Sequence, residues 1–291
     1  MSEVHANGLR FHVQRLGPPA DRPTLRTPVV FLHGLVLDNL SSFYYTLAAP
    51  IARAGSEVVL YDQRGHGRTE RPRTGYDPDT AVADLAALLK ACDVPTPVHL
   101  VGNSFGGLIA LHAARTRPDL VASLVLIEGQ CLDLRTDAEP TGTEPTEAEP
   151  YAGGWVEEMA NTLNLAALGL EAHPGPERLP TGPARKAARL RAGADALLNG
   201  TTLIEDVTLL RAPTEPELVD LACPVLAIYG ELSELAPPAR RLSELLANCT
   251  LTVLPGVAHT VLREATAPVL GALLDWLVRH EPAGTRSGVG R

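Results

Sequence analysis

Val98-His99-Leu100-Val101-Gly102-Asn103-Ser104-Phe105-Gly106-Gly107-Leu108-Ile109-Ala110 is the stretch that decides the fold of this chain. It begins as a short apolar run typical of a β-strand and continues as a helix, and a serine between two glycines joins them. Gly102 and Gly106 let the turn close tightly, because a Cβ at either place would collide with the neighbouring element. The pattern predicts a sharp strand-to-helix turn that exposes the Ser104 hydroxyl. The alternative is a serine that only caps a helix in a glycine-rich turn.

Length and composition predict one large domain, or one domain with an insertion. The chain has 291 residues, of which 45% are hydrophobic, and its formal net charge is −9. This acidic balance argues against nucleic acid and anionic membranes as main partners. The N-terminus lacks a basic stretch followed by an apolar run, and no apolar run approaches the length of a membrane span. We therefore expect a cytoplasmic protein without a signal peptide.

The cysteines are scattered and form no C-x-x-C pair. This spacing is typical of reduced thiols rather than of disulfides or metal ligands. We expect neither a metal nor a cofactor. The residues concerned are Cys92, Cys131, Cys223 and Cys249.

Strand and helix patterns alternate along most of the chain. A β-hairpin is predicted over residues 3–15 around Asn7-Gly8. Further strands are predicted at 28–32, 58–61, 124–128, 224–229 and 251–254, and helices at 40–54, 79–92 and 265–280. Continuous apolar runs as strands indicate a mostly parallel sheet covered by helices on both faces, which is a doubly wound α/β fold.

The alternation is interrupted between strands six and seven, which divides the predicted core into residues 1–130 and 221–281. Residues 137–150 hold three Glu-Pro dipeptides, five acids and no base, which predicts a mobile acidic loop. Apolar spacing at 155–170 and 184–198 predicts helices, so we expect residues 131–220 to form a helical lid over the sheet. The alternative is a surface excursion. Residues 282–291 are expected to be a flexible tail.

Three further motifs follow the predicted strands. His33-Gly34 follows the third strand, Asp62-x-Arg64-Gly65-His66-Gly67 follows the fourth, and Gly256-Val257-Ala258-His259 follows the last. Together with the serine turn, these motifs resemble those of the α/β-hydrolase superfamily over essentially the full length of the chain. The resemblance implies an α/β-hydrolase fold with a lid inserted between strands six and seven. It is far more specific for the fold than for the substrate.

The resemblance also implies a general base and an oxyanion hole. A serine hydroxyl needs an adjacent base to act as a nucleophile at neutral pH. The family keeps this base after the last strand, where His259 stands alone among nine histidines. The oxyanion hole would use the backbone N–H groups of Leu35 and Phe105.

Four other histidines are expected to have structural roles. His33 and His66 stand in turn motifs that are structural in the family. His99 and His112 fall within a predicted strand and a predicted helix, where packing is the default role of a histidine.

The triad acid departs from the common pattern of the family. Most relatives place an aspartate three residues beyond the glycine of Gly230-Glu231-Leu232-Ser233, and this chain has Ser233 there. Serine cannot balance the charge of an imidazolium. Strand six is expected to end in Glu128, and a minority of the fold, including some dehalogenases, lactone hydrolases and polyether thioesterases, places its acid there. We favour Glu128, with Glu234 second and Glu231 third. The alternative for Glu128 is a carboxylate that caps a helix or belongs to the lid loop.

The nucleophile narrows the reaction class. Haloalkane dehalogenases and epoxide hydrolases of similar fold use aspartate at this turn. Asn103-Ser104-Phe105 is also similar to enzymes that cleave carbon–carbon bonds of dienol ketones, but those usually keep the aspartate after strand seven. Ester, lactone or thioester cleavage remains. Ser104, Glu128 and His259 together most resemble the thioesterases that release polyketide chains, particularly polyether ones. A cyclase using the same pocket and a non-catalytic ligand receptor stay as alternatives.

The predicted lid suggests what the substrate is. We expect an apolar, roomy pocket with Trp155, Leu163 and either Phe43 or Tyr44 at its walls. A basic cluster in the lid would hold a phosphopantetheine phosphate or the acidic helix of an acyl carrier protein. The alternative is a solvated helix face that keeps the lid soluble. The cluster consists of Arg178, Arg185, Lys186, Arg189 and Arg191.

Overall fold

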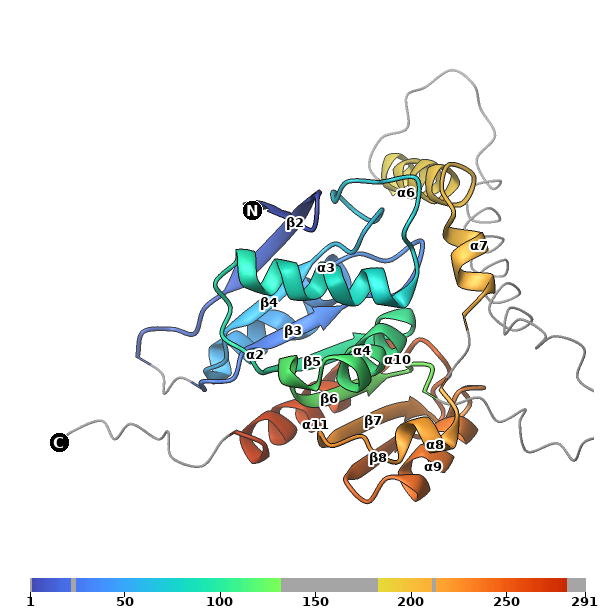
Figure 1. Ribbon diagram of the computed structural model, residues 1–291. Coiled ribbons are helices and arrows are strands. Elements are labelled where there is room, and N and C mark those ends of the chain that lie inside the picture. The colour runs from blue at the N-terminus through green and yellow to red at the C-terminus, as the bar shows by residue number, and fades with distance from the viewer. Residues whose placement is uncertain (1, 22–24, 132–182, 211–212, 282–291) are drawn as a thin grey trace, which may run out of the picture.

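In the computed structural model, residues 2–21, 25–131, 183–210 and 213–281 are described, and they form an eight-stranded sheet flanked by helices (Figure 1). The strand order is β1-β2-β4-β3-β5-β6-β7-β8. The strands are β1 (Ser2–Ala6), β2 (Leu9–Leu16), β3 (Val29–Leu32), β4 (Val58–Tyr61), β5 (Val98–Asn103), β6 (Val121–Ile127), β7 (Val225–Gly230) and β8 (Cys249–Leu254). This is the α/β-hydrolase architecture that the motifs predicted.

The sheet is antiparallel at one edge and parallel elsewhere. β1 and β2 form the predicted hairpin, and both of its turn residues, Asn7 (φ 44°) and Gly8 (φ 77°), have the positive φ that a tight hairpin turn requires. β2 pairs antiparallel with β4, and every later pairing is parallel. The carboxyl ends of β3 to β8 therefore meet at one edge. β3 and β5 are neighbours there although β4 lies between them in sequence, and such a switch point is where open α/β sheets bind ligands.

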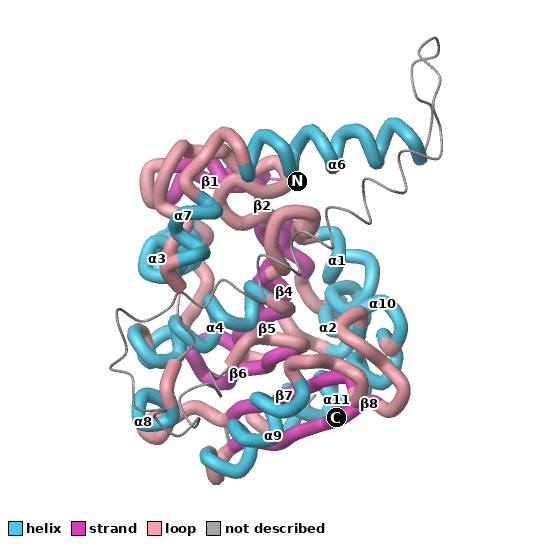
Figure 2. The backbone as a smooth tube through the Cα atoms, turned by 90° about the vertical axis from the view of Figure 1, so that its right-hand side faces the viewer, coloured by secondary structure: helices cyan, strands magenta, loops and turns pink. Residues whose placement is uncertain are grey.

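Helices cover both faces of the sheet, and Figure 2 shows α3 and α4 on one side with α1 and α2 on the other. Successive strand residues point to opposite faces, so that Phe31 packs with the α1, α2 and α11 layer while Leu32 packs with α3, α4 and α9. The elements on the first face are α1 (Ser41–Phe43), the π-helical turn η1 (Tyr44–Ala48), α2 (Ala49–Ala54), α10 (Val261–Glu264) and α11 (Thr266–Arg279). Those on the second are α3 (Pro78–Ala91), α4 (Phe105–Thr116) and α9 (Ala236–Leu245), and the 3-10 turn η2 (Pro118–Leu120) follows α4.

Three described helices lie between β6 and β7: α6 (Pro183–Leu198), α7 (Leu203–Thr208) and α8 (Glu215–Leu218). The junction of α6 and α7 is held on the loop between β4 and α3. Thr202 donates its N–H to the Arg73 carbonyl at 2.8 Å, and Tyr76 donates its N–H to the Asp206 carboxylate at 2.8 Å. The predicted acidic loop at 137–150, the predicted helix at 155–170 and the predicted tail at 282–291 lie outside the described residues.

Two further findings concern the described ranges. None of their helices is long and apolar enough to cross a membrane. All four cysteines are free, and among the described residues no group of three or more His, Cys, Asp or Glu side chains could hold a metal ion.

Candidate active site

Ser104 lies at a strained turn between β5 and α4. Its backbone angles are φ 51° and ψ −120°, which a residue with a Cβ rarely adopts, and its N–H donates to the Ile127 carbonyl at 3.0 Å. Gly106 is required here, because a Cβ at this position would collide with the Leu32 carbonyl of β3. The turn therefore holds Ser104 at the carboxyl edge of the sheet, at the N-terminus of α4. This is the sharp strand-to-helix turn that the sequence predicted around Ser104.

Glu128 comes directly after β6 and also has a positive φ of 50°. Its side chain is completely buried. Its N–H donates to the Ile228 carbonyl of β7 at 3.0 Å, and the Tyr229 hydroxyl donates to the next carbonyl, that of Gly129. These bonds fix the turn, so the Glu128 carboxylate is directed across the end of β7.

The Glu128 carboxylate contacts His259. The distance from His259 Nδ1 to Glu128 Oε2 is 3.2 Å, and about a quarter of the His259 side chain (26%) is exposed. The 256–259 loop passes close over the end of β7, where a Cβ on Gly230 would collide with the Val257 and Ala258 carbonyls. The structure thus brings together two of the predicted site residues from opposite sides of β7.

Two further donors meet the same carboxylate. The Gly230 N–H donates to Glu128 Oε1 at 2.5 Å, and the Ser233 hydroxyl donates to Glu128 Oε2 at 2.5 Å. Three donors therefore surround a carboxylate that has no contact with solvent, which is the arrangement that stabilises a buried negative charge.

The second and third candidates for the acid are exposed. Glu234 is exposed, and Glu231 is exposed and accepts the Gly256 N–H at 2.9 Å. Neither has the burial and the contact with His259 that Glu128 has, so the geometry favours Glu128.

The loop after β3 is held by two histidines. His33 Nε2 accepts the Gln63 N–H at 2.9 Å, and His66 Nε2 accepts the Val36 N–H at 2.9 Å. Val36 has a φ of 60°, which is strained for a β-branched residue. Burial, and then the neighbouring His33, lowers the pKa of His66 to about 3, so the ring stays neutral and its Nε2 remains an acceptor at neutral pH. These bonds fix the loop that carries Leu35, the predicted oxyanion residue.

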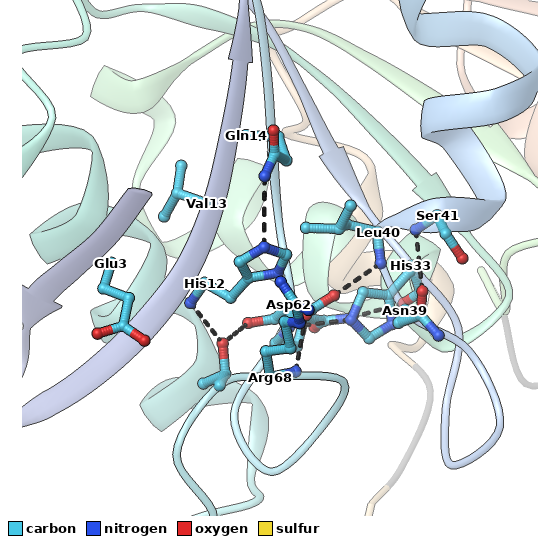
Figure 3. Close-up of polar contacts among 12 residues, drawn as sticks. Glu3, His12, Val13, Gln14, His33, Asn39, Leu40, Ser41, Asp62 and Arg68 are labelled. Atoms are coloured by element: carbon cyan, nitrogen blue, oxygen red, sulfur yellow. Dashed lines mark hydrogen bonds and ion pairs between the residues drawn. The ribbon is translucent and has the colours of Figure 1, made fainter. Parts of the chain in front are cut away.

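Asp62 anchors the neighbouring loops, as Figure 3 shows. One carboxylate oxygen accepts the Leu40 N–H at 2.9 Å. The other accepts the Arg68 N–H at 2.8 Å and lies 2.8 Å from Nδ1 of His12. A single buried side chain thus ties β2, the loop before α1 and the loop after β4, and it holds the carboxyl edge of this part of the sheet.

The other two histidines that we weighed lie in elements, as expected. His99 is buried in β5 with its Nδ1 2.7 Å from the Ser123 hydroxyl, and burial lowers its pKa to about 4. His112 is half-buried in α4 with its Nε2 2.6 Å from the Asp79 carboxylate. Both have structural partners.

Of the residues predicted to form the pocket walls, the structure describes Phe43 and Tyr44. Of the two alternatives, Phe43 has its side chain fully buried in the core, with its ring tilted against that of Phe31 and the ring centroids 4.5 Å apart. The physical reason is that α1 turns this residue toward β3. Tyr44 is half-buried and packs against the same core cluster, so its role stays a prediction. Trp155 and Leu163 lie outside the described residues.

A small cavity borders the predicted oxyanion residues. Its volume is about 20 Å³, enough for about one water molecule. Leu35 and Phe105 line it from the site, and Tyr76 and Leu203 line it from the α3 and α7 side. Polar side chains, among them Gln63, Arg64 and Asp84, complete the lining, so the cavity is too small and too mixed in character to indicate an acyl group.

Comparison with known proteins agrees with this geometry. Residues 27–264 match the family model of the alpha/beta hydrolase fold.

The chain belongs to the α/β-hydrolase family.

Several curated relatives share most of this α/β hydrolase. A non-heme chloroperoxidase of Streptomyces lividans is 29% identical over 252 residues, which cover 81% of this chain and 86% of the relative. A 2-(acetamidomethylene)succinate hydrolase of Mesorhizobium japonicum is 27% identical over 260 residues, covering 86% and 87%. Polyketide synthase ThaQ of Burkholderia thailandensis is 30% identical over 237 residues, covering 78% of this chain and 11% of the synthase. Family and relatives together make this protein a serine hydrolase.

Sequence reasoning missed two features of the site in this α/β hydrolase. Ser233 was noticed only as a departure from the usual acid, yet its hydroxyl contacts the Glu128 carboxylate. The Gly230 N–H was not considered at all. The signal was available in part, since a polar residue at the common acid position is expected to lie near the same histidine.

Proposed function

We propose that this serine hydrolase cleaves a thioester or ester of a bulky, hydrophobic, polyketide-like acyl group through an acyl-enzyme on Ser104. The observation that carries the proposal is the contact of the buried Glu128 carboxylate with His259 Nδ1 at 3.2 Å. This contact lies at the sheet edge where β5 ends at the strained Ser104. Ser104, His259 and Glu128 are then nucleophile, base and acid of a catalytic triad.

The proposed reaction has two balanced steps. Because His259 Nδ1 faces Glu128, Nε2 is the nitrogen that takes the proton from the Ser104 hydroxyl as Oγ attacks the acyl carbon. The bond to the leaving thiol or alcohol breaks, and His259 returns the proton to that group. Water then attacks the acyl-enzyme by the same route, releasing the acid and restoring Ser104.

Backbone donors stabilise the negative oxygen that forms in both steps. We assign this role to the N–H groups of Leu35 and Phe105, which belong to the loop after β3 and to the first turn of α4. The bonds of His33 and His66 to neighbouring backbone groups support the first of these donors, because they keep its loop rigid.

One observation supports the acyl class. ThaQ, one of the relatives, is a polyketide synthase, and the matched part is 11% of its length. We further propose that residues 131–220 form a lid, that Trp155 and Leu163 contribute to the acyl pocket, and that an acyl carrier protein delivers the substrate. A cytoplasmic location also stays a prediction.

Two alternatives use the same fold. A lactone or carboxylester hydrolase, or a cyclase in which a substrate hydroxyl replaces water, needs no change in Ser104, His259 or Glu128. A non-catalytic ligand receptor is disfavoured, since Glu128 occupies the place of the missing strand-seven acid with full burial and contact to His259.

Covalent labelling tests the proposal. A fluorophosphonate should modify Ser104, located by mass spectrometry, and Ser104→Ala should lose several orders of magnitude in kcat because the triad acts as a unit. Glu128→Gln keeps the shape but loses the charge, so its kcat should fall roughly 10²–10⁴-fold. Glu234→Gln is the matched control and should retain activity.

Two results would contradict the proposal. Labelling of another serine would refute the mechanism, and an inactive Glu234→Gln would refute the assignment of Glu128 as the acid. A panel of acyl thioesters, esters and lactones, with product analysis for ring closure, then separates the three reaction types.

A further inference from the structure

The neighbours of the Ser233 hydroxyl fix the direction in which it donates its proton. Its oxygen accepts the Leu235 N–H at 3.2 Å, and it lies 2.5 Å from Glu128 Oε2. A serine hydroxyl has a single proton and two lone pairs. Since a backbone donor occupies one lone pair, and an ionised carboxylate can only accept, the proton lies on the line to Oε2.

This bond reaches the oxygen that also contacts His259. Oε2 is shared by Ser233 and His259 Nδ1, while Oε1 is held by the Gly230 N–H. Ser233 is itself buried, at 5% exposure, and Glu128 has none, so water does not replace a lost donor at this carboxylate. Hydrogen bonds to a buried charge are among the strongest in proteins.

We propose that Ser233 is a positioning residue of the catalytic triad, which fixes the Glu128 carboxylate in the rotamer and charge state that align His259. The inference rests on the proposed function, because it requires Glu128 to be the triad acid. It explains why the position that commonly holds the acid carries a hydroxyl. The acid has moved to β6, and the residue after β7 has become a donor to it.

Kinetics of Ser233→Ala as a function of pH test the proposal. We expect kcat to fall about 10- to 100-fold with KM unchanged, since the hydroxyl acts through Glu128 and not on the substrate. The acid limb of the kcat/KM profile, which reports protonation of the base His259, should move up by roughly half to one pH unit, because a carboxylate with one hydrogen-bond donor fewer attracts the imidazolium more strongly.

Ser123→Ala is the matched control. Ser123 is also fully buried, and its hydroxyl bonds to His99 and Trp276 on β5 and α11, away from Glu128. This variant should lose a comparable amount of stability but keep the kcat and acid limb of the native enzyme. Ser233→Thr, which retains the hydroxyl, should recover most of the rate.

Two further variants, Ser233→Cys and Glu128→Gln, keep the test decisive if Ser233→Ala does not fold or if the acid is wrongly assigned. If Ser233→Ala does not fold, Ser233→Cys, with a similar volume and a weaker donor, should show the same shift to a smaller degree. An acid limb and a kcat equal to the native values in either folded variant would overturn the inference. If Glu128→Gln is fully active, the proposed acid has failed instead, and the two failures are thereby distinguished.

Discussion

Backbone strain gathers at the residues that we assign to chemistry. Among the described residues, five other than glycine have a positive φ, and three of them lie on loops of the site: Val36, Ser104 and Glu128. Each such residue costs on the order of 1–3 kcal/mol, which the surrounding structure must offset. At Ser104 and Glu128 the strain directs a side chain that a relaxed turn would point elsewhere. These positions therefore lower the stability of the fold while they orient the Ser104 and Glu128 side chains.

The strain at Ser104 predicts an order of stability among inactive variants. The free energy of unfolding of Ser104→Gly should exceed that of Ser104→Ala by about 1 kcal/mol, because only glycine adopts φ 51° and ψ −120° without strain. Urea unfolding followed by circular dichroism measures the difference. At Ser123, which lies in β6, the order should be reversed, since glycine weakens a strand. An alanine variant at 104 as stable as the glycine variant would show that the turn is unstrained.

Most strands could be predicted closely from the sequence, but the contacts between the elements could not. Apolar runs located β3, β4, β5 and β7 to within about one residue, because a strand buried on both faces must be continuously apolar. The same pattern could not show that Glu128 reaches across β7, since this depends on the register of β6, β7 and β8. Phe43 illustrates the other limit. It was expected, as an alternative to Tyr44, at the wall of the pocket, but the direction of α1 placed its ring in the core.

The elbow helix and the Glu128 turn are in direct contact, which predicts coupled damage. A Cβ on Gly107, in the first turn of α4, would lie 2.6 Å from the Gly129 Cα. Gly107→Ala must separate the elements that carry Ser104 and Glu128, so both the melting temperature and kcat should fall, the latter by at least about tenfold. Gly271→Ala is the control. Gly271 lies inside α11 with no atom within 4 Å of an added Cβ, and alanine there should raise stability by about 1 kcal/mol. Native kcat in Gly107→Ala would show that the contact does not set the site.

Exposed arginines stand on one loop of this acidic chain. The chain carries a net −9, yet three arginines, Arg68, Arg71 and Arg73, are exposed on the loop between β4 and α3. The junction of α6 and α7 is bound to this loop through the Arg73 carbonyl. Arg185, Lys186, Arg189 and Arg191 of the predicted basic cluster belong to α6, while Arg178 lies outside the described residues. We propose that the exposed arginines of the loop, together with this cluster, steer an acidic carrier protein to the enzyme.

This proposal predicts how substrate delivery responds to salt. The kcat/KM for a carrier-bound acyl thioester should fall steeply as ionic strength rises, and several-fold in Arg73→Glu and in Arg185→Glu/Arg189→Glu, because screening and charge reversal both slow encounter. The same acyl group on a small neutral thiol should respond little, since it gains nothing from the charged surface. Arg53→Glu provides the control for net charge, because Arg53 is exposed on α2 in the opposite layer. Equal responses of the carrier-bound and free thioesters would exclude the carrier. A free ester or lactone would then be the better substrate, and the arginines would serve only to keep α6 hydrated.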